Sequence, residues 1–178
     1  MKNRSDRCKR AAIGLAAAVA TSFAFAGQAQ AQFTGPGIYK IRVAGTNQVL
    51  DIDSGWGHGG WPGQRLLRWG SNDGANQRFI IFEDGDGYVI RPLHSLMCLD
   101  FPYDRRDPGT EIQQLGCNRS QAQRFYIASH GARQTLIFGN WTGDTRLYAP
   151  TEGQRVVLTP RRRGIPYEGG TLFEFERM

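Results

Sequence analysis

Val49-Leu50-Asp51-Ile52 recurs as Cys98-Leu99-Asp100-Phe101 and, in altered form, as Arg146-Leu147-Tyr148-Ala149. Each copy is followed by a second phrase, which reads Asn76-Gln77-Arg78-Phe79, then Ala122-Gln123-Arg124-Phe125, then Gly170-Thr171-Leu172-Phe173. The leucines are 49 and 48 residues apart, and the final phenylalanines 46 and 48. A fixed period in this range indicates repeated supersecondary units, each of which needs its neighbours to bury its apolar face. Three such units predict a closed threefold object.

The first 31 residues have a different character. A head with five basic residues and one acid precedes an apolar run from Ala11 to Ala26, and the segment ends at Ala29-Gln30-Ala31. This order is typical of a secretory signal peptide. We therefore expect a leader over residues 1–31, a mature domain over residues 32–178, and a secreted, extracellular protein. The alternative is an uncleaved anchor, although the apolar run is shorter than the ~20 residues of a membrane span.

The charge of the chain lies mostly in its leader. The net charge of +6 falls to +2 when residues 1–31 are removed. A strongly basic domain would indicate nucleic acid as a partner, and this nearly neutral one does not. The remaining 147 residues are the size of a single domain that can bury a sizeable core. After signal removal we expect no membrane span.

The mature part has the pattern of an all-β protein. Glycine and proline recur every few residues and divide the chain into short segments, which favours a barrel or sandwich. Asp84-Gly85 is a hairpin-turn signal. The candidate strands are Ile38–Val43, Arg78–Phe82, Tyr88–Pro92, Arg124–Ala128, Gln134–Phe138, Val156–Pro160 and Leu172–Glu176.

Two cysteines remain after the leader, Cys98 and Cys117. An even pair in an exported protein indicates a disulfide. The alternative is a pair of free thiols.

The three copies, each with a leucine-led phrase and a late aromatic, resemble the ricin-type lectin family. The resemblance implies a β-trefoil fold with three pseudo-threefold repeats of about 48 residues. The family's late motif is Gln-x-Trp, and here Gln77-Arg78-Phe79 and Gln123-Arg124-Phe125 carry Phe instead. The phenylalanine is expected to fill the shared core, while the glutamine satisfies local backbone groups. The resemblance also implies a bridge within the second repeat, from Cys98 to Cys117. The first repeat has Val49 and, near the second cysteine position, Trp69, so no bridge is expected there.

Sugar binding needs charged acceptors, amides and an aromatic face, and the first repeat offers all three. A carboxylate can accept hydrogen bonds from two neighbouring hydroxyls, and an amide both donates and accepts. Asp51 follows a strand, Asn76 closes the repeat, and Trp61 lies in a glycine-rich loop that also holds Trp56. We expect Asp51, Asn76 and Trp61 to bind carbohydrate. The alternatives are a turn or backbone cap for Asp51 and packing against the loop's stem for either tryptophan.

The second repeat offers Asp100, Tyr103 and Gln113 as further carbohydrate-binding residues, with Asn118 nearby. It departs from the family at two positions. Leu115 stands where a stacking ring is expected, so that Tyr103 would have to supply the aromatic face, and Ala122 stands where an asparagine is usual. In the third repeat Tyr148 replaces the aspartate, and no site of this type is expected.

These observations predict a secreted, non-catalytic lectin-like module whose partner is a glycan or polysaccharide. The rival prediction is a protein-interaction trefoil, such as a toxin subunit, adaptor or inhibitor, that has lost sugar binding. The substitutions Leu115, Ala122 and Tyr148 favour that rival, whereas the Asp51–Asn76 pair favours the lectin. No Ser-His-Asp or other catalytic arrangement stands out, and no metal or other cofactor is expected.

Overall fold

The computed structural model describes residues 32–55, 60–131, 133–139, 143–161 and 169–178. The predicted leader and Trp56 lie outside these residues. Within them, twelve strands fall into three successive sets of four. The first set is β1 (Gly37–Val43), β2 (Gln48–Ile52), β3 (Leu66–Gly70) and β4 (Arg78–Asp84), the second is β5 (Gly87–Pro92), β6 (Cys98–Asp100), β7 (Gln113–Leu115) and β8 (Tyr126–His130), and the third is β9 (Gln134–Phe138), β10 (Thr145–Tyr148), β11 (Val157–Pro160) and β12 (Phe173–Arg177).

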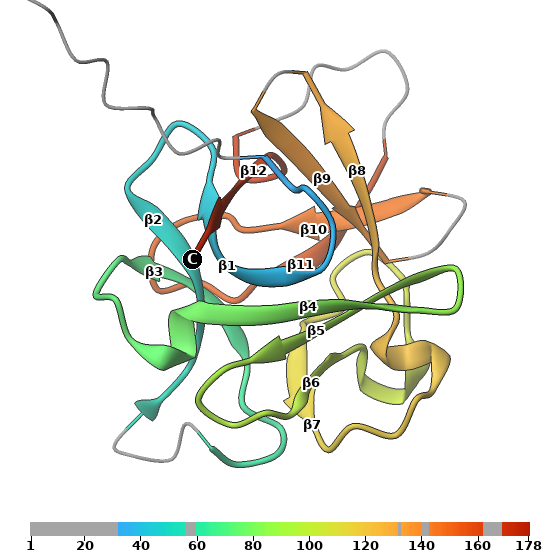
Figure 1. Cartoon of the computed structure of the whole chain (residues 1–178). Helices are drawn as coiled ribbons and strands as arrows, with labels where there is room; N and C mark the ends of the chain where they lie inside the picture. Colours follow the sequence, from blue (N-terminus) through green and yellow to red (C-terminus); the bar gives the residue numbers. More distant parts are fainter. Residues whose placement is uncertain (1–31, 56–59, 132, 140–142, 162–168) are drawn as a thin grey trace, which may run out of the picture.

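The first and last strands of each set form a closed barrel. β1 pairs with β12 and with β4, β4 pairs with β5, and β9 pairs with β8 and β12. The remaining junction, between β5 and β8, is made by Tyr88 and Phe125, which exchange two backbone hydrogen bonds of 2.8 Å. The path of strands therefore returns to β1 (Figure 1), and closure leaves the barrel without a free edge.

The two middle strands of each set form a hairpin outside the barrel: β2–β3, β6–β7 and β10–β11. In Figure 1 the first two lie at the left and at the bottom of the molecule. A ring of backbone hydrogen bonds joins the three hairpins. Leu66 N–H donates to the Ile112 carbonyl (2.9 Å), Ile112 N–H to the Val156 carbonyl (3.1 Å), and Val156 N–H to the Leu66 carbonyl (2.8 Å). Each repeat thus binds the next, and the predicted threefold object is confirmed.

The recurring sequence motifs supply large side chains to the core. Their leucines and phenylalanines are fully buried, and each such side chain contributes about 1.5–3 kcal/mol relative to exposure. Phenylalanine therefore fills the position of the family's tryptophan without leaving the core open, as predicted. These six residues are Leu50, Leu99, Leu147, Phe79, Phe125 and Phe173.

The predicted strands match the barrel strands and the hairpin strand β11 to within about two residues, and the other five hairpin strands were not predicted. Asp51 was expected after a strand and instead lies within β2. The Asp84-Gly85 turn is confirmed: β4 and β5 form a hairpin there, with Gly85 at φ +64°. The described residues contain no helix with the length and apolar character that crossing a membrane requires.

Candidate functional site

The first candidate site lies on the β2–β3 hairpin and is organised around the Asp51 carboxylate. Asp51 is only 4% exposed. Asn76 Nδ2 donates to Asp51 Oδ1 (3.0 Å), and Gln77 Nε2 donates to Asp51 Oδ2 (2.6 Å). Both amides lie on the short 3-10 helix η2 (Ala75–Gln77) that precedes β4. Asp51 is therefore held by two side-chain amides, and its carboxylate has acceptor positions left for a ligand.

Gln77 connects this carboxylate to the backbone around it. Its Nε2 also donates to the Gly70 carbonyl (2.8 Å), and its Oε1 accepts from the Asn72 N–H (2.8 Å). Because Gln77 is fully buried, it is a positioning residue for Asp51. The predicted role of this glutamine, which is to satisfy local backbone groups, is confirmed.

Burial in this setting changes the acidity of Asp51. Loss of solvent raises the pKa of the Asp51 carboxyl to about 6 from an ordinary 3.8. The hydrogen bonds from Gln77 and Asn76 lower this pKa, and the neighbouring Asp53 carboxylate raises it. Asp51 is therefore ionised at neutral pH and protonated in mildly acidic solution.

A cavity of about 250 Å³ opens beside this carboxylate. Trp69, on β3, forms part of its wall with 46% of its surface exposed, and Leu67 lies opposite Asp51 in the β2–β3 register. The volume is below the ~300–1,000 Å³ of pockets for drug-sized ligands, which suits a single ring. The cavity is lined by Asp51, Asp53, Ser54, Gly55, Leu67, Trp69, Asn72 and Asn76.

Trp61 does not belong to that lining. Trp61 is 60% exposed, so it is not a core residue. Its carbonyl oxygen accepts from Gln114 Nε2 (2.8 Å), which attaches its loop to the second repeat. The structure thus places Trp69, rather than Trp61, beside Asp51 and Asn76.

The second repeat reproduces the polar arrangement of the first. Gln123, on the 3-10 helix η4 (Gln121–Gln123), donates through Nε2 to Asp100 Oδ2 (3.3 Å) and to the Gly116 carbonyl (3.0 Å). Its Oε1 accepts from the Asn118 N–H (2.9 Å), as Gln77 does from Asn72. The amide that Asn76 supplies in the first repeat comes here from Gln113, whose Nε2 donates to Asp100 Oδ1 (3.1 Å).

A cavity of about 440 Å³ lies beside Asp100. Its wall includes Asp100, Tyr103, Gln113 and Asn118, which the sequence analysis grouped in the second repeat. Leu115 and Ala122 also line this cavity, so the expected departures are part of its wall. Tyr103 precedes Asp104 in the short helix η3 (Pro102–Asp104) and is 91% exposed.

The third repeat has a different structure at the corresponding positions. Tyr148 is half-buried, and the backbone N–H of Ala149 donates to the Gly170 carbonyl (2.8 Å). A Cβ atom added to Gly170 would overlap the Ala149 carbonyl oxygen. The backbone just after β10 and the segment before β12 therefore lie in direct contact at this point.

A disulfide joins Cys98 and Cys117, so the predicted bridge is present. The register of the hairpins also shows which residue of the first repeat corresponds to Cys117, a position that was expected near Trp69. Gly70 and Gly116 both accept from the buried glutamine of their repeat, which aligns Ser71 with Cys117 and Trp69 with Leu115. Trp69 therefore occupies the stacking position that the second repeat has lost. A comparison of Trp69-Gly70-Ser71-Asn72 with Leu115-Gly116-Cys117-Asn118 in the sequence could have found it.

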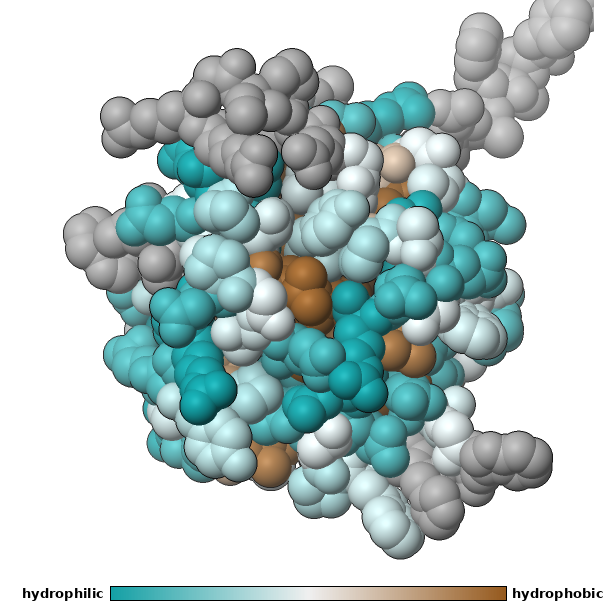
Figure 2. All heavy atoms as spheres, turned by 180° about the vertical axis from the view of Figure 1, so that it is seen from behind, coloured by the Kyte–Doolittle hydropathy of each residue, from teal (hydrophilic) through white to brown (hydrophobic). Residues whose placement is uncertain are grey.

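The surface is polar over the face turned toward the reader in Figure 2. Hydrophilic side chains predominate among the described residues there, and apolar atoms show only as small patches between them.

The chain resembles a known family of proteins. Residues 28–115, which span the first repeat and most of the second, match the family described as "Ricin-type beta-trefoil lectin domain-like". The resemblance to the ricin-type family is confirmed. No curated protein matches the chain.

Solved structures share the trefoil. A designed threefold-symmetric protein, ThreeFoil, superposes with a TM-score of 0.68 at 18% identity, covering 80% of this chain and 99% of its own. The Macrolepiota procera ricin B-like lectin in complex with lactose gives 0.66 at 18% identity, covering 83% and 99%. The Polyporus squamosus lectin, bound to the human-type influenza-binding epitope Neu5Acα2-6Galβ1-4GlcNAc, gives 0.68 at 20% identity, covering 82% and 50%. At these identities the likeness establishes the β-trefoil fold.

Proposed function

We propose that this chain is an exported, non-catalytic carbohydrate-binding protein and that its main sugar site is in the first repeat. The observation that carries the proposal is the Asp51 carboxylate, which Asn76 and Gln77 orient beside the partly exposed Trp69. A carboxylate with free acceptor positions binds two neighbouring hydroxyls through charge-assisted hydrogen bonds. The indole of Trp69 covers the apolar face of the sugar ring that carries these hydroxyls.

Asp100, Gln113 and Tyr103 are proposed as a second site of the same kind. Trp61 remains a predicted contact that the geometry favours less than Trp69, because the cavity beside Asp51 is lined without it. The predicted leader over residues 1–31 supports export. The lactose complex of the Macrolepiota procera lectin makes lactose the first sugar to test.

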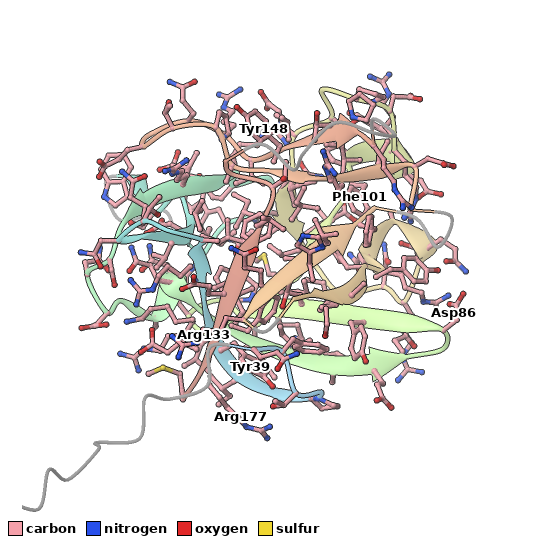
Figure 3. All side chains as sticks on the ribbon, turned by 90° about the horizontal axis from the view of Figure 1, so that it is seen from above. Tyr39, Asp86, Phe101, Arg133, Tyr148 and Arg177 are labelled. Atoms are coloured by element: carbon pink, nitrogen blue, oxygen red, sulfur yellow. A yellow bond between two sulfur atoms is a disulfide. The ribbon has the colours of Figure 1, made fainter. Side chains whose placement is uncertain are left out.

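The experiment is a glycan array with the protein lacking residues 1–31, followed by calorimetric titration with lactose and with the best-bound glycans. Asp51→Ala should abolish binding at the first site and leave the fold intact. Asp86→Ala is the matched control, because this carboxylate lies at the tip of the β4–β5 hairpin, at the edge of the molecule in Figure 3. Binding that survives Asp51→Ala but is lost in Asp100→Ala would move the main site to the second repeat.

The second candidate function is a protein-interaction trefoil. The observation that favours it is Tyr103, which is 91% exposed on a repeat that lacks the usual stacking ring. Absence of glycan binding by the unsubstituted protein would favour this reading.

A further inference from the structure

The second repeat carries two neighbouring cavities rather than one. Beside the cavity at Asp100 lies another of about 480 Å³, and the two share three wall residues, Arg65, Pro102 and Tyr103. The far cavity, which we define by the remaining wall, is lined by Arg105, Asp107, Pro108, Gly109, Thr110 and Glu111. A ligand at Asp100 that extends past Tyr103 therefore enters a second recess.

Polar side chains connect the two cavities through Arg65. Its Nη1 donates to Gln113 Oε1 (2.8 Å), and Gln113 in turn donates to Asp100. On the other side Arg65 Nε lies 3.2 Å from Glu111 Oε2. One guanidinium, contributed by the first repeat, thus orients the amide of the near cavity and a carboxylate of the far cavity.

Tyr103 stands between the cavities in a costly conformation. Tyr103 and Asp104 both have positive φ, 58° and 55°. Such backbone geometry is unfavourable for non-glycine residues and concentrates at ligand-binding sites. Its ring is almost fully exposed, and the Arg105 guanidinium lies 5.7 Å from the ring centre. The strained turn therefore holds an aromatic ring at the shared border, where it can contact ligand on either side.

The charges of the far cavity indicate what it accepts. Arg65 and Arg105 supply two cations to its wall, while Asp107 and Glu111 supply two anions. This balance favours neither an anionic nor a cationic ligand, but it offers donors and acceptors together. Neutral hydroxyl groups use both.

We propose that the far cavity is a second subsite and that the second repeat binds a neutral oligosaccharide across Tyr103, with one unit at Asp100 and the next between Arg105 and Glu111. This inference rests on the proposed function and adds that the second repeat recognises a chain of at least two sugar units.

The test uses titration of the Asp51→Ala protein, in which the first site is silenced, with xylo-, cello- and galacto-oligosaccharides of one to four units. In the series that binds, affinity should rise about tenfold, or 1.4 kcal/mol, between one unit and two or three. Thr110→Trp fills the far cavity alone and should remove this gain while leaving monosaccharide affinity unchanged. Tyr103→Ala should weaken all members of the series.

Gln154→Trp is the matched control. The Thr110 carbonyl accepts from the Leu158 N–H (2.9 Å) as the Gln154 carbonyl accepts from the Arg68 N–H (3.0 Å), so the control places the same ring at the equivalent position of another hairpin. Binding that does not depend on chain length, or a gain that survives Thr110→Trp, would overturn the second subsite and leave the proposed function standing. Failure of the unsubstituted protein to bind any member of the panel or any arrayed glycan would contradict both.

Discussion

At the scale of single residues, Asp51 is a buried carboxylate that is proposed to bind hydroxyl groups. Two amides hold its carboxylate in place. Loss of solvent around this carboxylate raises its pKa to about 6. A protonated carboxyl loses its charge and one acceptor position, and charge-assisted hydrogen bonds are roughly twice as strong as neutral ones.

We therefore expect lactose or glycan binding at the first site to weaken as the pH falls through about 6. Titrations at pH 7.5, 6.5, 5.5 and 4.5 measure this, with Asp51→Asn as the control because it cannot titrate. Binding that is equally strong at pH 7.5 and 4.5 would contradict the role given to the ionised carboxylate.

The same pKa predicts the opposite trend in stability. The pKa is raised in the folded state, so between about 6 and 3.8 the folded protein binds more protons than the unfolded one, and the contribution of Asp51 to stability increases as the pH falls through this window. Above pH 6 the cost of burying the charge is fully present. The melting temperature of the unsubstituted protein, relative to that of Asp51→Asn, should be higher at pH 4 than at pH 7.

The two described tryptophans of the first repeat allow a direct comparison. Trp69→Ala should lower glycan affinity at least tenfold, because this ring forms the cavity wall beside Asp51. Trp61→Ala should cost well under the ~3–5 kcal/mol of a core Trp→Ala change, since 60% of the side chain is already exposed. Affinity and thermal stability measured on both variants separate the two roles. If only Trp61→Ala lowered glycan affinity, Trp61 would be the aromatic contact of the first site, as the sequence predicted.

At the scale of elements, the third repeat differs from the other two in its backbone as well as its side chains. Gly170 has φ +95°, and an added Cβ would meet the Ala149 carbonyl oxygen. Gly170→Ala should therefore destabilise the protein by more than the ~1–2 kcal/mol of a left-handed alanine. Gly45→Ala is the control, because Gly45 also has positive φ (+73°) but no atom lies within 4 Å of an added Cβ. Equal losses in a urea titration would show that the overlap is relieved without cost.

The second hairpin carries the disulfide. In the chain-entropy model a loop of this length stabilises by about 3 kcal/mol. The double variant Cys98→Val, Cys117→Ser copies the first repeat, which has Val49 and Ser71 at these positions. It should lose about 2–4 kcal/mol in a denaturant titration, and its midpoint should no longer respond to reductant. An unchanged free energy of unfolding would mean that the bridge adds little to the packed hairpin.

The sequence predicted these elements unevenly, for physical reasons. Barrel strands such as Gln134–Phe138 carry enough apolar residues to be recognised alone. The hairpin strands β6 and β7 are only three residues long, and the register of each hairpin is set by the pairing of its two strands. This register aligns Trp69 with Leu115. It therefore identifies Trp69, rather than Trp61, as the aromatic residue beside Asp51. The role of Arg65 was also missed, because its partners Glu111 and Gln113 belong to another repeat.

At the scale of the whole molecule, the periodic leucines and phenylalanines were sufficient to predict a threefold core, because burying them requires all three units together. The candidate sites follow the opposite logic. Their repeated part is Asp51 and Asp100, and their aromatic part depends on departures such as Trp69 and Leu115, which become visible when the repeats are aligned with one another.

The ring formed by Leu66, Ile112 and Val156 has a consequence for how the molecule opens. Every bond in it joins two repeats, so no hairpin can detach alone without breaking two of the three bonds. Local fraying is therefore suppressed at this point, and the three amides should exchange hydrogen for deuterium only when the entire chain unfolds. Their exchange rates should agree with one another and should accelerate together in Cys98→Val, Cys117→Ser, although that change lies in one repeat. A trefoil built this way behaves as a single cooperative unit, in contrast to an open repeat array, where each end melts independently.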